Sequence, residues 1–140
     1  MTGLDKRLFF LLNMAQRKLF NHVDKLCEQQ LDAPVTQLAA LLYVCKQPGC
    51  QQKDLAQALA LNKSGITTLV RRMENNQLLE RKSSAADGRA SQLYATAAGL
   101  QKAQQLGPYI DELNQGFADH FSDEEITTVL KFLNFIIKRF

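Results

Sequence analysis

Apolar residues recur every three or four positions through most of the chain, which is the spacing of amphipathic helices. The stripe over residues 4–31 predicts one long helix. That helix should end before Pro34, because the residue preceding a proline is displaced from the helical region. Residues 35–46 contain LAALLYVC and are apolar nearly all round, so we expect a buried helix there.

Two short helices and a hairpin are predicted in the middle of the chain. Helices at about residues 53–60 and 63–76 follow one another almost without a linker, and Asn62 is a good N-cap for the second. The period then changes, and the strand-like runs LLERKSS and SQLYAT flank residues 85–90 as a β-hairpin. Two helices joined by a minimal turn and followed by a hairpin describe a winged helix-turn-helix, whose second helix enters the DNA major groove.

The last third of the chain is again helical in pattern. Thr96 should cap a helix that is interrupted near Gly107 and Pro108 and continues to about residue 120. A final helix begins after Ser122, with acidic residues in its first turn, where they suit the helix dipole.

Both ends of the chain carry more apolar surface than a small domain can cover by itself. The LFFLL run near the start is one such surface. The final helix carries a wider stripe, formed by Ile126, Val129, Leu130, Phe132, Leu133, Phe135, Ile136, Ile137 and Phe140. Exposed patches of this size are unusual on soluble monomers, so we expect a homodimer. The alternative is that the two ends pack only on each other within a monomer.

The expected fold is mainly α with a small β-hairpin wing, in which a winged helix-turn-helix core is flanked by N- and C-terminal dimerisation helices. We expect a single domain over residues 1–140, since this length suits one domain. Residues 33–99 should form the winged helix-turn-helix, and residues 1–32 and 100–140 the dimerisation region.

Composition and charge narrow the class of function. The net charge is +3, which is compatible with nucleic-acid binding without being diagnostic of it. Three cysteines without CxxC spacing argue against a disulfide scaffold or zinc ribbon, and they suit a reducing cytoplasm. The charged residues after LFFLL argue against a signal peptide, and no run approaches the length of a membrane span. No catalytic motif, phosphate-binding glycine loop or metal motif is present, so we expect neither an enzyme nor a cofactor.

The helix over residues 63–76 carries a candidate DNA-reading face. Its apolar stripe should face the core, and the opposite face carries Ser64, Thr67, Thr68 and Arg71, with Arg72 beside them. Hydroxyls near a helix start can meet a phosphate or a base edge, and arginine can grip guanine O6 and N7 with two hydrogen bonds. The alternative is an ordinary solvated helix face that carries two arginines.

The hairpin tip carries a second candidate contact. Arg89 on a projecting ribbon can enter the minor groove, where narrow A·T-rich stretches attract cations. Asp87 can hold Arg89 in an extended orientation through a bidentate pair. The alternative is a surface ion pair that contributes little.

The run QQKDLAQALALNKSGITTLVRRMENNQLLERKSSAADGRASQLYATAAG closely resembles the DNA-binding core of the multiple-antibiotic-resistance regulator (MarR) family. The family pattern D-x-R followed by T-x-x-G is present here as Asp87, Arg89, Thr96 and Gly99. The resemblance implies a homodimeric transcriptional repressor that binds double-stranded DNA. Such a repressor reads an inverted-repeat operator, with its recognition helices in adjacent major grooves. It also implies relief of repression by a small-molecule effector or by oxidation.

Carried over by motif position, the resemblance places Ser64, Thr67, Thr68 and Arg71 on the base-facing side. By the same argument Lys63 and Arg72 are phosphate contacts and Arg89 is the wing arginine.

The chain departs from the family pattern in the turn after the recognition helix and at two other positions. Gln77 stands where the family usually has glycine, so we expect Asn76 to adopt the left-handed conformation instead. Gln51 replaces a Ser/Thr cap, and Ala95 replaces a large aliphatic residue before the threonine.

Two other functions remain open from the sequence. A redox-sensing regulator of the same fold is one, because Cys50 lies in a loop where nearby lysines could lower its pKa, whereas Cys27 and Cys45 fall on apolar stripes. A winged helix that binds only proteins is the other. His22 and His120 have no second ligand at metal spacing, and no residue set marks an effector pocket.

Overall fold

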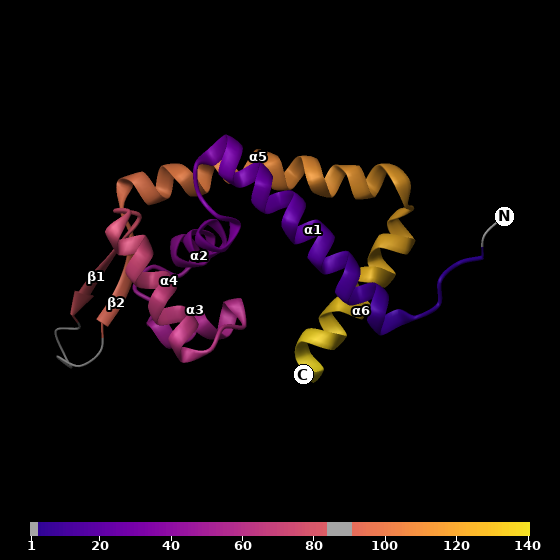
Figure 1. Cartoon of the computed structure of the whole chain (residues 1–140), viewed down its shortest axis with the longest axis horizontal. Helices are drawn as coiled ribbons and strands as arrows, with labels where there is room; N and C mark the ends of the chain where they lie inside the picture. Colours follow the sequence, from indigo (N-terminus) through magenta and orange to yellow (C-terminus); the bar gives the residue numbers. More distant parts are fainter. Residues whose placement is uncertain (1–2, 84–90) are drawn as a thin grey trace. The chain divides into compact units, whose positions relative to one another are not determined.

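The computed structural model describes residues 3–83 and 91–140 of the chain (Figure 1). Its elements are α1 (Leu8–Leu31), α2 (Val35–Lys46), α3 (Gln52–Leu59), α4 (Lys63–Asn75), β1 (Leu79–Ser83), β2 (Ser91–Ala95), α5 (Ala97–His120) and α6 (Asp123–Arg139). This order confirms the expected fold class, a mainly helical chain with a small hairpin wing. The chain divides into two compact units, Met1–Leu106 and Gly107–Phe140, and α5 begins in the first and ends in the second.

The core of the first unit is built around α2. Figure 1 shows α2, α3 and α4 beside the hairpin, and α2 contacts α1, α3 and β2. Its side chains Leu38, Leu41 and Val44 are fully buried, as the apolar run predicted. The apolar stripe of α4 is also buried, which leaves the opposite face of that helix outward.

The hairpin pairs β1 with β2 in antiparallel register, from Leu79 opposite Ala95 to Ser83 opposite Ser91. The loop after α2 also pairs with the hairpin, because Cys50 forms an isolated antiparallel bridge with Leu93 on β2. Leu93 donates to the Cys50 carbonyl at 2.8 Å, and Gly49 donates to the Leu93 carbonyl at 2.9 Å. The base of the wing is therefore tied to the segment between α2 and α3.

The turn from α4 into β1 corrects one expectation. Gln77, not Asn76, adopts the left-handed conformation, with φ values of 61° and −83° respectively. The Leu78 N–H donates to the Met73 carbonyl at 2.9 Å, and the Gln77 N–H donates to the Glu74 carbonyl at 3.0 Å. These two bonds form a Schellman motif, whose left-handed residue is usually glycine. The two hydrogen bonds of the motif thus hold Gln77, a residue with a Cβ, in the left-handed conformation, which is strained for such a residue.

The threonine and glycine that follow the wing have definite structural roles. The Thr96 hydroxyl donates to the Gln77 carbonyl at 2.6 Å and accepts from the Gly99 N–H at 3.0 Å, so it caps α5 as predicted. A Cβ on Gly99 would overlap with the Leu78 carbonyl and press on Leu41. Only glycine allows α5 to begin this close to the turn.

Two other helix bounds differ from the expectation. The first helix begins at Leu8 rather than residue 4, because the Asp5 carboxylate binds the Arg7 backbone N–H at 3.0 Å and its guanidinium at 2.8 Å. This local pairing competes with helical hydrogen bonding. The second difference is that α5 continues through Pro108 without the expected interruption. A proline removes one helical hydrogen bond, but α5 continues on both sides of it.

The second unit consists of the end of α5 and α6. Ser122 caps α6 as expected, because its hydroxyl accepts from the Glu125 N–H at 3.2 Å and its own N–H donates to the Glu125 carboxylate at 2.9 Å. The hydrogen bonds that the Glu125 carboxylate accepts from Ser122 lower the pKa of that carboxyl group. None of residues 107–140 is buried, and large apolar side chains such as Leu130, Phe135 and Ile137 are exposed. Over residues 3–83 and 91–140, no helix is long and apolar enough to cross a membrane.

Candidate nucleic-acid interface

The N-terminus of α4 is organised by Asn62. Its side-chain oxygen accepts from the Gly65 N–H at 2.8 Å and from the Ser64 hydroxyl at 3.1 Å. This confirms the predicted N-cap, which satisfies one of the N–H groups that a helix start leaves without an intrahelical partner. Lys63 and Ser64 are both exposed in this first turn.

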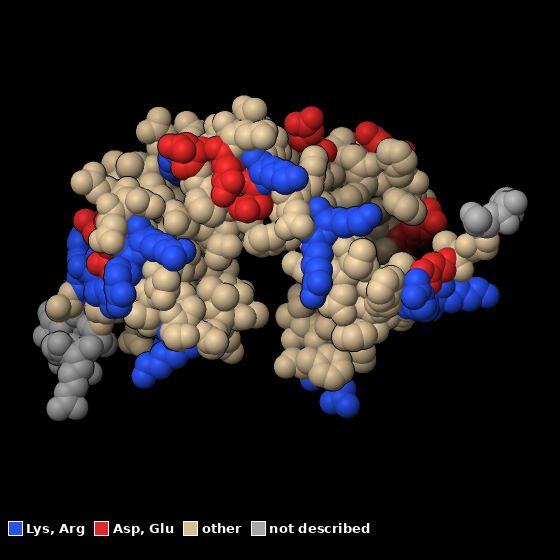
Figure 2. All heavy atoms as spheres, in the orientation of Figure 1, with Lys and Arg blue, Asp and Glu red and all other residues tan. Residues whose placement is uncertain are grey.

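The outward face of α4 carries most of the predicted DNA contacts. Thr68, Arg71 and Arg72 are exposed, and the Thr68 hydroxyl donates to the Ser64 carbonyl at 3.0 Å. Among the residues that the structure describes, neither arginine forms an ion pair. As far as the described part of the chain shows, their guanidinium groups are therefore available to contact a ligand. Figure 2 shows Lys and Arg side chains gathered over the region of α4 and the hairpin base.

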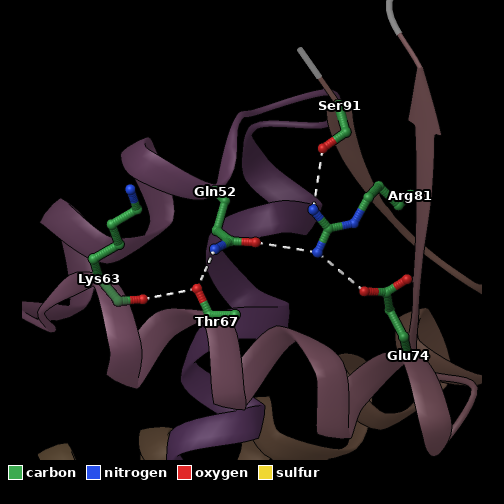
Figure 3. Close-up of polar contacts among 6 residues, drawn as sticks. All are labelled: Gln52, Lys63, Thr67, Glu74, Arg81 and Ser91. Carbon is green, nitrogen blue, oxygen red and sulfur yellow. Dashed lines mark hydrogen bonds and ion pairs between the residues drawn. The ribbon is translucent and has the colours of Figure 1, made fainter. Parts of the chain in front are cut away.

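A hydrogen-bonded cluster lies between α4, α3 and the two strands of the hairpin (Figure 3). We call it the Arg81 cluster. Arg81 on β1 donates to Ser91 on β2 at 3.2 Å, and its other terminal nitrogen donates to Gln52 and to Glu74, each at 3.1 Å. Gln52 begins α3 and Glu74 lies in the last turn of α4. One arginine therefore joins four elements.

The cluster continues to Thr67, one of the predicted base-facing residues. The Gln52 amide nitrogen donates to the Thr67 hydroxyl at 2.9 Å, and that hydroxyl donates to the Lys63 carbonyl at 2.8 Å (Figure 3). A hydroxyl has one proton, and here the proton is already committed. Thr67 is half-buried, so its hydroxyl serves the protein interior rather than an outside partner.

The wing-tip pair cannot be placed. Asp87 and Arg89 lie outside the described residues, so their predicted roles stay predictions. At the described base of the hairpin, Lys82 lies 3.7 Å from Glu80 and its ammonium lies 4.9 Å from the centre of the Tyr94 ring. Among the described residues, the partners of the Lys82 ammonium therefore lie on the hairpin itself and not on α4.

The cysteines do not support the loop-thiol expectation. Cys27 is buried, and Cys45 and Cys50 are half-buried. Burial raises the pKa of all three thiols, and at Cys50 the neighbouring Asp54 carboxylate raises the pKa further. The expectation that lysines lower the pKa of Cys50 is therefore wrong, because Cys50 is half-buried where it pairs with β2 and lies near the Asp54 carboxylate. Within the described residues, no group of three or more His, Cys, Asp and Glu side chains could hold a metal ion.

Sequence reasoning missed the Arg81 cluster as a unit. Its members are polar residues scattered from position 52 to position 91, and no spacing rule connects them. The one available signal was an arginine on a strand that starts next to the recognition helix, with an acidic residue seven positions before it.

Residues 31–90 match the model of the MarR family. The transcriptional regulator HosA of Escherichia coli is 29% identical to this chain over 110 residues, which cover 78% of this chain and 82% of HosA. Over its winged helix-turn-helix the chain is therefore similar to the MarR family. The curated relatives are transcriptional regulators and not enzymes, which agrees with the function that the resemblance of the motifs implied.

Solved structures agree with the fold of this chain. The S. aureus MepR–DNA complex superposes with a TM-score of 0.87 at 24% identity, covering 96% of this chain and 99% of MepR. The PcaV regulator of Streptomyces coelicolor, crystallised with its natural ligand, has a TM-score of 0.80 at 23% identity and covers 99% of this chain and 98% of PcaV. At these identities the likeness establishes the winged helix-turn-helix fold.

Proposed function

We propose that this chain is a repressor that binds an inverted-repeat operator as a homodimer, with α4 of each subunit in a major groove. The outward face of α4 carries the proposal, because it is exposed while the opposite face is buried in the core. Arg71 is assigned to a guanine edge, where its fork geometry fits O6 and N7. Lys63 and Arg72 are assigned to phosphates, which position the helix without reading sequence.

The short side chains on this face have narrower roles. Ser64 and Thr68 are exposed and can turn their hydroxyls toward a phosphate or a base edge. Thr67 has its hydroxyl proton committed to Lys63, so we assign it a methyl contact to a thymine. Arg89 is assigned to the minor groove with Asp87 as its support, which rests on their motif positions.

The homodimer is supported by the apolar surface of residues 107–140. Leu130, Phe135 and Ile137 are 52%, 61% and 76% exposed, which is unusual for side chains of this size on a soluble monomer. We assign residues 1–32 and 100–140 to dimerisation and residues 33–99 to DNA binding. A second copy about a two-fold axis would cover this surface and give the protein the symmetry of a palindromic operator.

We also propose that a small molecule modulates DNA affinity, as the ligand-bound PcaV structure suggests by analogy. A tenfold loss of affinity needs a coupling free energy of about 1.4 kcal/mol, which one ligand can supply. Cysteine oxidation is the less supported route, since the raised pKa of each thiol disfavours the reactive thiolate.

Selection of bound fragments from random duplex DNA tests the proposal. The expected result is an inverted repeat with half-sites about one helical turn, or roughly 10 bp, apart. A single asymmetric half-site would refute the dimeric docking. Failure to enrich any sequence, together with a flat salt dependence of binding, would instead favour a protein-interaction module, because phosphate contacts release counterions and give a steep slope.

Sedimentation tests the dimer separately. The wild-type chain should sediment as a dimer at low micromolar concentration, and Leu133→Glu should lose the dimer together with the fold. A stable, folded species of 15.8 kDa would contradict the proposal.

A further inference from the structure

The hydrogen bonds of the Arg81 cluster have a defined direction. A guanidinium can only donate, so the Gln52 side chain must present its oxygen to Arg81 and its nitrogen to Thr67. The Thr67 hydroxyl then accepts from Gln52 and donates onward to the Lys63 carbonyl. A single ordered chain of donors thus runs from the hairpin to the first turn of the recognition helix (Figure 3).

Arg81 also holds the other end of the same helix. Its ion pair with Glu74 reaches the last turn of α4, and its bond to Ser91 ties in the second strand. The hairpin is therefore bonded to α4 at both ends, through Glu74 directly and through Gln52 and Thr67 indirectly. Such an arrangement restrains the rotation of the hairpin relative to α4.

We propose that Arg81 is a positioning residue that sets the placement of the wing relative to the recognition helix and so contributes to operator specificity. The inference rests on the proposed function, in which α4 and the wing contact neighbouring grooves. Specificity of this kind depends on both elements meeting the duplex in one fixed arrangement. A wing that moves freely on α4 can still bind phosphates, but it no longer rewards one sequence over another.

The contacts of Arg81 distinguish it from a phosphate ligand. Three of its five N–H donors are already bound inside the protein, and its charge is paired with Glu74 at 3.1 Å. Arg71 and Arg72 have no ion pair among the described residues. Arg81 is thus the arginine whose removal should change geometry more than charge.

Substituting either member of the Arg81–Glu74 ion pair distinguishes a positioning role from a phosphate-binding role, because the two members have opposite charges. For a positioning pair, Arg81→Met and Glu74→Gln each lower the ratio of operator to non-specific affinity, by about five- to tenfold, and the double variant loses no more than either single one. For a phosphate ligand, Arg81→Met weakens binding to every duplex, whereas Glu74→Gln frees a cation and strengthens it.

Titrations over a range of salt concentrations supply a second measure. Arg81→Met should leave the slope of log affinity against log salt unchanged, whereas Arg72→Met, which removes one proposed phosphate contact from each subunit of the dimer, should reduce the slope by about 1.8. Lys82→Met is the matched control, since it removes the adjacent cation of the same strand, which pairs with Glu80 and not with α4. Its ratio of specific to non-specific affinity should equal that of the wild type.

Amide hydrogen exchange of the DNA-free protein keeps this inference independent of operator binding. Arg81→Met and Glu74→Gln should speed exchange across residues 79–83 and 91–95, and Lys82→Met should not. Wild-type protein that selects no operator would refute the proposed function, while exchange would still test the coupling of the wing to α4. An operator-selective wild type whose Arg81 and Glu74 variants keep full discrimination and normal exchange would overturn the positioning role alone.

Discussion

The left-handed residue after α4 provides a stability test in which the substitution should stabilise the protein, whereas most substitutions destabilise a protein. Gln77 has a φ of 61°, and the two bonds of the Schellman motif hold it there. For a residue with a Cβ, the left-handed backbone conformation is roughly 1–2 kcal/mol less stable than the right-handed conformation, whereas for glycine the difference is close to zero. Glycine is also more costly to order from the unfolded chain, which offsets part of the gain.

We therefore expect Gln77→Gly to raise the free energy of unfolding by about 1 kcal/mol. For a chain of 140 residues the unfolding entropy near the midpoint is about 0.3 kcal/mol/K, so the expected increase in Tm is about 3 °C. Thermal and urea unfolding measured at one protein concentration supply both quantities. The concentration must be matched because the stability of a dimer depends on it.

The neighbouring asparagine is the matched control. Asn76 has a φ of −83°, an ordinary value, so Asn76→Gly relieves no strain and adds the entropic cost of glycine. We expect it to be neutral or destabilising. If Asn76→Gly stabilised the protein and Gln77→Gly did not, the left-handed residue would be misassigned and the strain argument would be refuted.

Three further predictions concern packing, DNA readout and thiol chemistry. Gly99→Ala should destabilise the fold by about 1–3 kcal/mol in urea unfolding, because its Cβ would overlap with the Leu78 carbonyl; unchanged stability would mean that α5 does not start this close to the turn. Arg71→Ala should cost about 1–3 kcal/mol for each half-site and relax one base preference per half-site, while Arg89→Ala should weaken binding to A·T-rich flanks more than to G·C-rich ones. Titration against operators that differ only in their flanks measures both losses, and equal losses on every sequence would contradict the minor-groove role. Alkylation of the folded protein at neutral pH should be slow at all three cysteines and should accelerate only above the ordinary thiol pKa, since burial raises each value; rapid alkylation of Cys50 near pH 7 would contradict its burial.

The sequence by itself determined the elements whose signals are local. Pro34 and the turn residues after Lys46 bound α2 at the predicted positions, and Asn62 caps α4 through an oxygen three residues from its donor. The apolar stripe of α4 identified its buried face, and therefore also the outward face that we propose contacts DNA. These features depend on neighbours within one or two helical turns, which periodicity and capping rules describe.

Only the tertiary structure decided the features that depend on distant partners. Gln77 takes the left-handed conformation within bonds from α4, and the Thr96 hydroxyl, 19 residues later in the chain, binds its carbonyl. Arg81 meets Gln52 across 29 residues because strand register and helix packing bring the two side chains together. Such contacts have no period in the sequence, since the separation of the partners is set by the path of the chain between them. For the same reason the hydroxyl of Thr67, which looks outward on a helical projection, is bound within the protein.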